Sequence, residues 1–151
     1  MAARPRITLL TVGTLREAFW RDAAAEYVKR LGGLTSRLEI LEVEEDDSAR
    51  ESTRLLAKLP PRALVIACDG RGKTQSSEAL SARIEQACVD GEGHLAFVIG
   101  GSDGLSDTVR ERADSLLSFG PMTFPHQLLR VMLLEQIYRA LQISKGSAYH
   151  K

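Results

Sequence analysis

Two segments near the end of this chain carry residue types and spacings that suit chemistry. Residues 149–151 (YHK) place a phenol, an imidazole and an ammonium next to one another, so that one short segment can exchange a proton, stack on a ring and hold an anion. Residues 97–104 (FVIGGSDG) change from an apolar run to a glycine-rich turn, where the missing Cβ atoms let the backbone approach a ligand closely. We expect any reaction to take place where these two segments meet. Taken alone, residues 149–151 would be a frayed chain end.

The glycine-rich turn does not fit the two best-known nucleotide-binding motifs. A P-loop needs a lysine where Leu105 stands, and a dinucleotide fingerprint needs G-x-G-x-x-G after the first strand rather than after a later one. A second turn is predicted at residues 69–73 (DGRGK), which would either hold an anion or simply connect two elements. By itself, each turn indicates a tight loop rather than a cofactor site.

The composition predicts one globular domain covering residues 1–151. The chain is 44% hydrophobic and 26% charged, with 20 basic and 20 acidic residues. A formal charge of zero argues against a protein that binds nucleic acid without regard to sequence, although not against a local basic site. Cys68 and Cys88 lack the spacing of a zinc site, so we expect no metal and two reduced thiols in the cytoplasm. The first residues lead into too few apolar positions for a signal peptide or a membrane span.

Alternating strand and helix patterns predict an α/β fold with a mostly parallel sheet flanked by helices. The expected strands cover residues 7–12, 38–43, 63–68, 95–99 and 116–119, and the expected helices cover residues 15–31, 48–59, 77–88, 107–113 and 127–143. Thr14 is the expected cap of the first helix, with Phe19 on its apolar face. The turns at residues 69–73, 100–104 and 120–125 all follow strands. Ligands bind at the carboxyl ends of parallel strands, so these turns are predicted to line one crevice, which suits a neutral planar group such as adenine.

The residues in combination resemble a known family. Residues 97–105 (FVIGGSDGL), 117–127 (LSFGPMTFPHQ), 135–140 (EQIYRA) and 149–151 (YHK), with VGT at 12–14 and EYVKRL at 26–31, are similar to the RlmH (YbeA-like) branch of the SPOUT RNA methyltransferases. The resemblance covers essentially the whole chain and is dense over its last third. Residues 44–58 match least.

The resemblance implies an enzyme that transfers a methyl group from S-adenosylmethionine to N3 of a pseudouridine in helix 69 of 23S rRNA. It further implies a homodimer, an assembled ribosome as the substrate, and a trefoil knot in the carboxyl-terminal part of the fold. Carried over by position, the cofactor contacts fall on Cys68, Gly101, Gly120, Pro121, Met122, Thr123, Phe124 and Pro125. Cys68 replaces an expected aliphatic residue, which matters little where the contact is made by backbone.

The catalytic candidates are His150, Tyr149 and Arg139. Methylation of an imide nitrogen requires loss of its proton, and histidine is the default base near neutral pH. We expect His150 to accept this proton or to stabilise the anionic base. Tyr149 would orient or stack on the ring, while Arg139 or Lys151 would hold phosphate. A methyl transfer to a tRNA base and a non-enzymatic nucleotide-binding module are the alternatives.

Four further features have less specific expectations. His126 is predicted to be a structural cap at a helix start, and Asp69 to be either a polar contact in the crevice or a turn residue. Arg130 would serve either the dimer or the RNA. The acidic run at residues 42–47 is expected to be a solvated loop.

Overall fold

The computed structural model describes residues 3–151, so Met1 and Ala2, at the start of the segment expected to be too short for a signal peptide, lie outside it. Ten elements alternate along the chain. They are β1 (Arg6–Val12), α1 (Ala18–Leu31), β2 (Arg37–Val43), α2 (Ser48–Ala57), β3 (Leu64–Thr74), α3 (Ser77–Asp90), β4 (His94–Ile99), α4 (Asp107–Arg112), β5 (Ser115–Ser118) and α5 (His126–Lys145).

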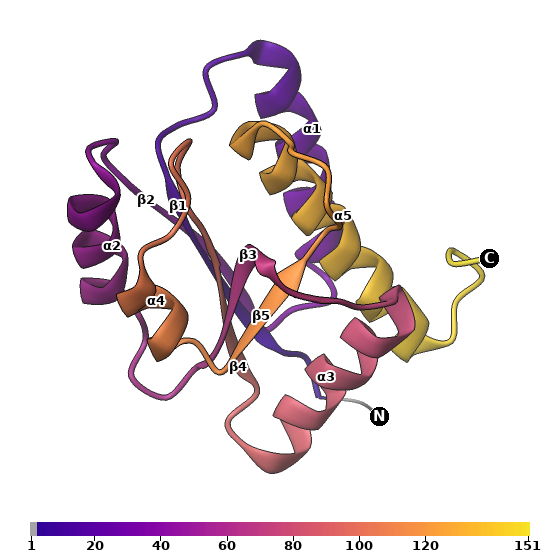
Figure 1. The fold of residues 1–151 in the computed structure, drawn as a ribbon. Helices are drawn as coiled ribbons and strands as arrows, with labels where there is room; N and C mark the ends of the chain where they lie inside the picture. Colours follow the sequence, from indigo (N-terminus) through magenta and orange to yellow (C-terminus); the bar gives the residue numbers. More distant parts are fainter. Residues whose placement is uncertain (1–2) are drawn as a thin grey trace.

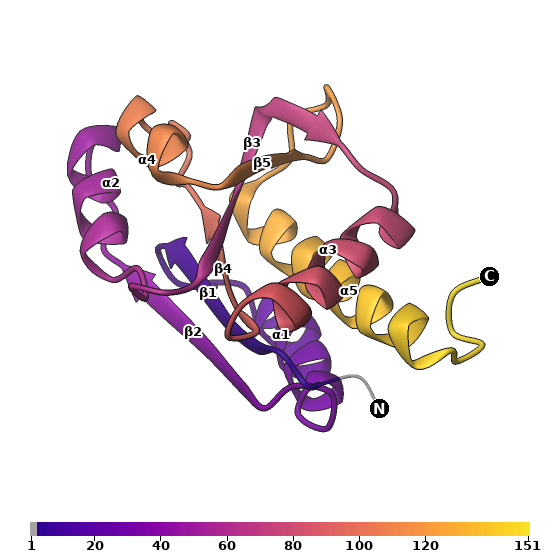
Figure 2. The ribbon, with the colours of Figure 1, turned by 90° about the horizontal axis from the view of Figure 1, so that it is seen from below.

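The strands form one parallel sheet in the order β2-β1-β4-β3-β5. Helices α1, α3 and α5 cover one face, and α2 and α4 cover the other (Figures 1 and 2). The predicted α/β fold with a mostly parallel sheet is therefore confirmed. The predicted knot stays an expectation from the resemblance.

Each face of the sheet has its own apolar core, as expected when helices cover both sides. Strand residues alternate between the two cores: Leu95, Phe97 and Ile99 of β4 face α1, α3 and α5, whereas Ala96 and Val98 face α2 and α4. Because every residue of β4 is buried, this strand is the centre of the fold. The glycine-rich turn that follows β4 is thus held by a rigid element.

The first helix differs from its prediction at its beginning. Its N-cap is Glu17, without a side-chain cap, rather than Thr14. Phe19 is 62% exposed, so the expectation that it lies on the buried face was wrong. Ala24 and Leu31 are the buried residues of this helix. The apolar face predicted from the sequence therefore turns away from the sheet at the first turn of the helix.

The third strand continues through the segment predicted to be a turn. Residues 69–73 belong to β3, and after a register shift beyond Cys68 the strand pairs again with β5, placing Lys73 beside Leu117 and Thr74 beside Ser118. The prediction of a turn at this position was wrong. The two glycines allow an irregularity within a strand instead of ending it.

Arg130 lies inside the fold and not on a surface for RNA or a partner. Its side chain is 4% exposed, and its guanidinium donates to Glu42 Oε2 at 2.7 Å and to the carbonyl of Gly13 at 3.0 Å. It thus ties α5 to β2 and to the end of β1. Glu45 and Asp46 of the acidic run also form ion pairs, with Arg16 and Arg54, so this run is braced rather than merely solvated.

Candidate active site at the strand tips

Residues within β3 and the segments that follow β4 and β5 surround one pocket of about 340 Å³, here called the strand-tip pocket. Seven of the eight sequence-predicted cofactor residues line it, namely Cys68, Gly101, Gly120, Pro121, Met122, Thr123 and Phe124. The eighth, Pro125, is not among its lining residues and instead forms the N-cap of α5. The expected crevice is present, and its volume lies within the range of roughly 300–1,000 Å³ that is typical of small-molecule sites.

The β4–α4 loop is folded tightly on itself. A Cβ added to Gly100 would lie 2.8 Å from the backbone carbon of Gly104, so no larger residue fits there without moving the loop. Gly101 and Gly104 form an isolated bridge, and the amide of Gly104 donates to the carbonyl of Gly101 at 3.0 Å. The loop therefore presents backbone rather than side chains to the strand-tip pocket.

Cys68 and Asp69 form the part of the pocket that β3 contributes. Burial, and after it the Asp69 carboxylate, raises the pKa of Cys68 to about 12, so this thiol stays protonated and is a poor nucleophile. The Asp69 carboxylate accepts hydrogen bonds from Arg110 at 3.0 Å and from the amide of Arg71 at 2.8 Å. Asp69 is therefore anchored to α4 and lies within the pocket wall, not in a free turn.

The catalytic candidates come together in a second cluster, here called the tail cluster, which consists of Glu78, Glu135, Arg139, Tyr149 and His150. Tyr149 donates to Glu135 at 2.8 Å, and its ring lies 4.8 Å from the Arg139 guanidinium carbon. Arg139 bonds to Glu135 at 2.9 Å and to His150 Nδ1 at 3.1 Å, while His150 Nε2 contacts Glu78 at 2.6 Å. The last residues are thus tied to α3 and α5 and are not frayed.

This geometry assigns the tautomer of His150. A guanidinium can only donate, so Nδ1 must accept from Arg139 and Nε2 must carry the proton that points at Glu78. In this arrangement the lone pair of Nδ1 is occupied by Arg139. His150 can accept a proton only after it separates from Arg139.

Tyr149 is held in its protonated form. Its hydrogen bond to the Glu135 carboxylate, followed by burial, raises the pKa of Tyr149 from 10.0 to about 12. The protonated phenol is favoured in the folded state, so the stabilisation from this bond is fully present below pH 10 and is lost as the pH rises through about 12.

Spectrophotometric titration tests this assignment. Of the three tyrosines (Tyr27, Tyr138 and Tyr149), we expect one to ionise near pH 12, and we expect Tyr149→Phe to remove this transition. Glu135→Gln should move the transition to lower pH because the amide lacks the negative charge that opposes phenolate formation. An unchanged transition in Glu135→Gln would mean that the carboxylate does not control the phenol.

The loop that leads into α5 and the carboxyl terminus lie at opposite ends of this helix (Figure 1), so the strand-tip pocket and the tail cluster are separated within one chain. His126, at the start of the helix, lines the pocket, whereas Arg139 lies about 20 Å further along the helix axis at a rise of about 1.5 Å per residue. The structure thus brings the predicted cofactor residues together and the predicted catalytic residues together, but it does not join the two groups.

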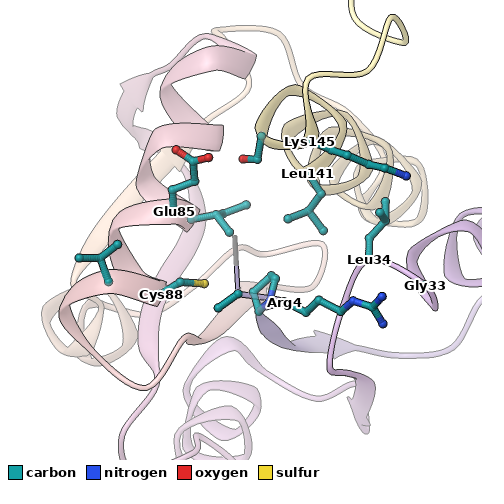
Figure 3. A pocket seen from close by; sticks show the side chains of 12 residues that line it. Arg4, Gly33, Leu34, Glu85, Cys88, Leu141 and Lys145 are labelled. Carbon is teal, nitrogen blue, oxygen red and sulfur yellow. The ribbon is translucent and has the colours of Figure 1, made fainter. Parts of the chain in front are cut away.

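A larger pocket, of about 850 Å³, lies at the opposite edge of the sheet (Figure 3). It is bounded by Arg4, Leu34, Cys88, Leu141 and Lys145, which come from the start of the chain and from the carboxyl ends of α1, α3 and α5. Ligands of parallel α/β sheets bind at the other edge, where the strands end. Size alone therefore does not make this pocket the active site.

Sequence reasoning missed three acidic residues. Glu78 and Glu135 hold the tail, and Glu51 is buried beside Gly101. Glu135 begins a segment that carries the resemblance, but no role was predicted for it, and no spacing or motif distinguishes Glu51 and Glu78 from surface glutamates. The prediction for His126 was wrong, because the N-cap of α5 is Pro125 and no residue between positions 3 and 151 forms a hydrogen bond with the buried His126 Nε2 atom.

Residues 3–151 contain neither a candidate metal site nor a candidate membrane span. No group of three or more His, Cys, Asp or Glu side chains in this part of the chain is placed to hold a metal ion. None of the helices in the same range is long and apolar enough to cross a membrane.

The fold and the pocket define an open α/β domain built to bind a small molecule at the tips of its parallel strands. Residues 6–150 match the family described as "Predicted SPOUT methyltransferase". The chain belongs to this family, and the methyltransferase class expected from the sequence is confirmed at this level.

Solved structures share the fold at low sequence identity. A probable methyltransferase from Bordetella pertussis has a TM-score of 0.60 at 14% identity, with 91% of this chain and 96% of that chain covered. A probable methylase family protein from Haemophilus influenzae has a TM-score of 0.58 at 14% identity, with 97% of this chain and 71% of that chain covered. The putative methyltransferase Lpg2936 from Legionella pneumophila, in complex with S-adenosylmethionine, has a TM-score of 0.50 at 14% identity. The match covers 93% of this chain and 66% of that chain.

Proposed function

We propose that this protein transfers the methyl group of S-adenosylmethionine to N3 of a pseudouridine in helix 69 of 23S rRNA, acting in the cytoplasm on the assembled ribosome. The observation that carries the proposal is the strand-tip pocket, lined by seven residues at the positions expected from the resemblance. Membership of a methyltransferase family, and the bound S-adenosylmethionine of the Legionella protein, support this donor.

The residues of the pocket suit S-adenosylmethionine. The β4–α4 loop and residues 120–124 offer backbone groups and small or apolar side chains to a planar base, and the loop between Pro121 and Pro125 is stiffened at both ends. Asp69 is neutralised by Arg110, but Glu51 places a buried carboxylate beside Gly101, which favours a cationic ligand. When bound, this group supplies an electrophilic methyl on a sulfonium.

The protein's own residues must position the target base and remove its proton. The new nitrogen–carbon bond forms as the carbon–sulfur bond breaks, and the N3 proton must leave to a base. Alignment of the reacting atoms can supply roughly 7–11 kcal/mol of barrier lowering. We assign the proton acceptor to His150, after its release from Arg139, while Tyr149 supports the ring and Arg139 then faces phosphate or the developing anion.

A homodimer would join the two halves of the site. Since α5 separates the pocket from the tail cluster by about 20 Å within one chain, we propose that the tail of one protomer reaches the pocket of its partner. The balanced overall charge suits an enzyme that recognises an assembled particle by shape, because weak phosphate neutralisation gives weak affinity for naked RNA.

A methyl-transfer assay tests the function directly. Labelled S-adenosylmethionine is offered with free rRNA, 50S subunits, 70S ribosomes and tRNA, and the modified nucleotide is then mapped. We expect label at a helix 69 pseudouridine in ribosomal particles and little label on free rRNA. Labelling of tRNA instead would mean that tRNA, and not rRNA, is the substrate. Binding of the donor without methyl transfer to any of the four RNAs or particles would contradict the assignment as an enzyme.

A further inference from the structure

A small polar recess of about 290 Å³ adjoins the strand-tip pocket, and we call it the acidic recess. It shares Gly101, Ser102 and His126 with the pocket. Its other walls include Glu51 from α2, Glu45 from the preceding acidic run and Arg16, which pairs with Glu45 at 3.0 Å. The pocket and the recess are therefore neighbours that share part of their lining.

Glu51 is the unusual residue of this recess. It is 4% exposed, and one carboxylate oxygen, Oε2, accepts from the amide of Asp46 at 3.0 Å. The other oxygen, Oε1, is buried and receives no hydrogen bond from any residue of the described range. A Cβ built on Gly101 would lie 2.9 Å from both oxygens, so the carboxylate lies directly against the loop that separates the recess from the pocket.

The unsatisfied oxygen is not needed to hold this loop. Two hydroxyl groups of α2 already do so: Ser48 donates to the carbonyl of Gly104 at 3.2 Å, and Ser52 accepts from the amide of Ser106 at 3.1 Å. A buried carboxylate oxygen without a donor is costly. Glu51 is thus in the state expected of a residue whose partner is a ligand.

The chemistry of the recess selects a cationic donor. Glu51 supplies the negative charge, since Glu45 is paired with Arg16, and the buried Nε2 of His126 receives no hydrogen bond from any residue of the described range. An ammonium group offers three donors and a positive charge, which form strong hydrogen bonds with a carboxylate. The donor proposed for the adjacent pocket carries such a group at its amino-acid end.

We propose that the acidic recess binds the amino-acid end of S-adenosylmethionine, with its α-ammonium donating to Glu51 Oε1. This inference rests on the proposed function, because it assumes that the adenosyl part occupies the strand-tip pocket. It assigns Glu51 a ligand contact that orients the donor and makes the site prefer ligands with a free amino group.

Equilibrium titration with two ligands tests the contact. The ligands are S-adenosylhomocysteine and its deaminated analogue, which differ only in the ammonium group. We expect the wild-type protein to bind S-adenosylhomocysteine about 10- to 100-fold more tightly than the analogue. In Glu51→Gln this preference should disappear, because S-adenosylhomocysteine loses affinity while the affinity for the analogue changes little.

Glu44→Gln is the matched control, since it removes one negative charge from an exposed position in the same acidic run and should retain the preference. Equal weakening of both ligands by Glu51→Gln would overturn the proposal and show that Glu51 only supports the loop. Equal affinities of the wild-type protein for S-adenosylhomocysteine and its deaminated analogue would also overturn the proposal. If the wild-type protein bound neither ligand, the proposed function itself would fail.

Discussion

We expect replacement of His150 with alanine to lower turnover by about 10²- to 10⁴-fold while S-adenosylmethionine still binds. This magnitude is the usual contribution of a general base. Binding is retained because His150 belongs to the tail cluster and is not a lining residue of the strand-tip pocket. Single-turnover methyl transfer on ribosomal particles measures the chemical step, and titration with S-adenosylmethionine measures binding.

A second substitution separates the chemical role from a structural one. Glutamine can keep the hydrogen bonds that His150 makes to Arg139 and Glu78, but it cannot accept a proton at neutral pH. We expect His150→Gln to be as slow as His150→Ala. Full turnover in His150→Gln would show that the imidazole only holds the tail in place.

We expect replacement of Arg130 with methionine to lower the free energy of unfolding by about 3 kcal/mol. Methionine approximates the aliphatic part of the arginine but removes the bonds to Glu42 and to the carbonyl of Gly13. Loss of one partner of a buried ion pair costs about 3–5 kcal/mol. The lower end applies here because the Glu42 side chain is 35% exposed, so water partly solvates the charge that remains.

Urea unfolding measures this change. The protein concentration is kept fixed because oligomerisation would otherwise shift the apparent stability. Arg37→Met is the matched control: its side chain is 63% exposed and it pairs with Glu39 at 3.4 Å, so we expect a change of less than about 0.5 kcal/mol. A loss in Arg130→Met as small as that of the control would contradict the structural role of the buried pair.

The sequence predicted the sheet and the pocket because both follow from local patterns. Apolar runs such as residues 95–99 mark buried parallel strands, and the loops that follow them necessarily meet at one edge of the sheet. The extension of β3 through residues 69–74 could not be predicted in this way. It depends on renewed pairing with β5, which lies more than forty residues later in the chain.

The roles of single charged residues were equally hidden. The residues around Glu51 and Arg130 follow the ordinary polar and apolar pattern of a helix. Only the tertiary structure shows that both side chains are buried. The pairing of Arg130 with Glu42 joins residues far apart in sequence, and a single sequence does not encode such a contact in any local signal. The tail cluster was predicted by residue type, but its acidic members were not.

The length of α5 limits how copies of this chain can be arranged. This unbroken helix has its first turn at the strand-tip pocket and its last turns beside the tail, so their separation is set by residue count and not by a flexible connection. In a two-fold symmetric pair, each chain meets its partner through the same surface. The end of each α5 can meet the beginning of the other only if the two helices run in roughly opposite directions, and this requirement places the two-fold axis roughly perpendicular to α5.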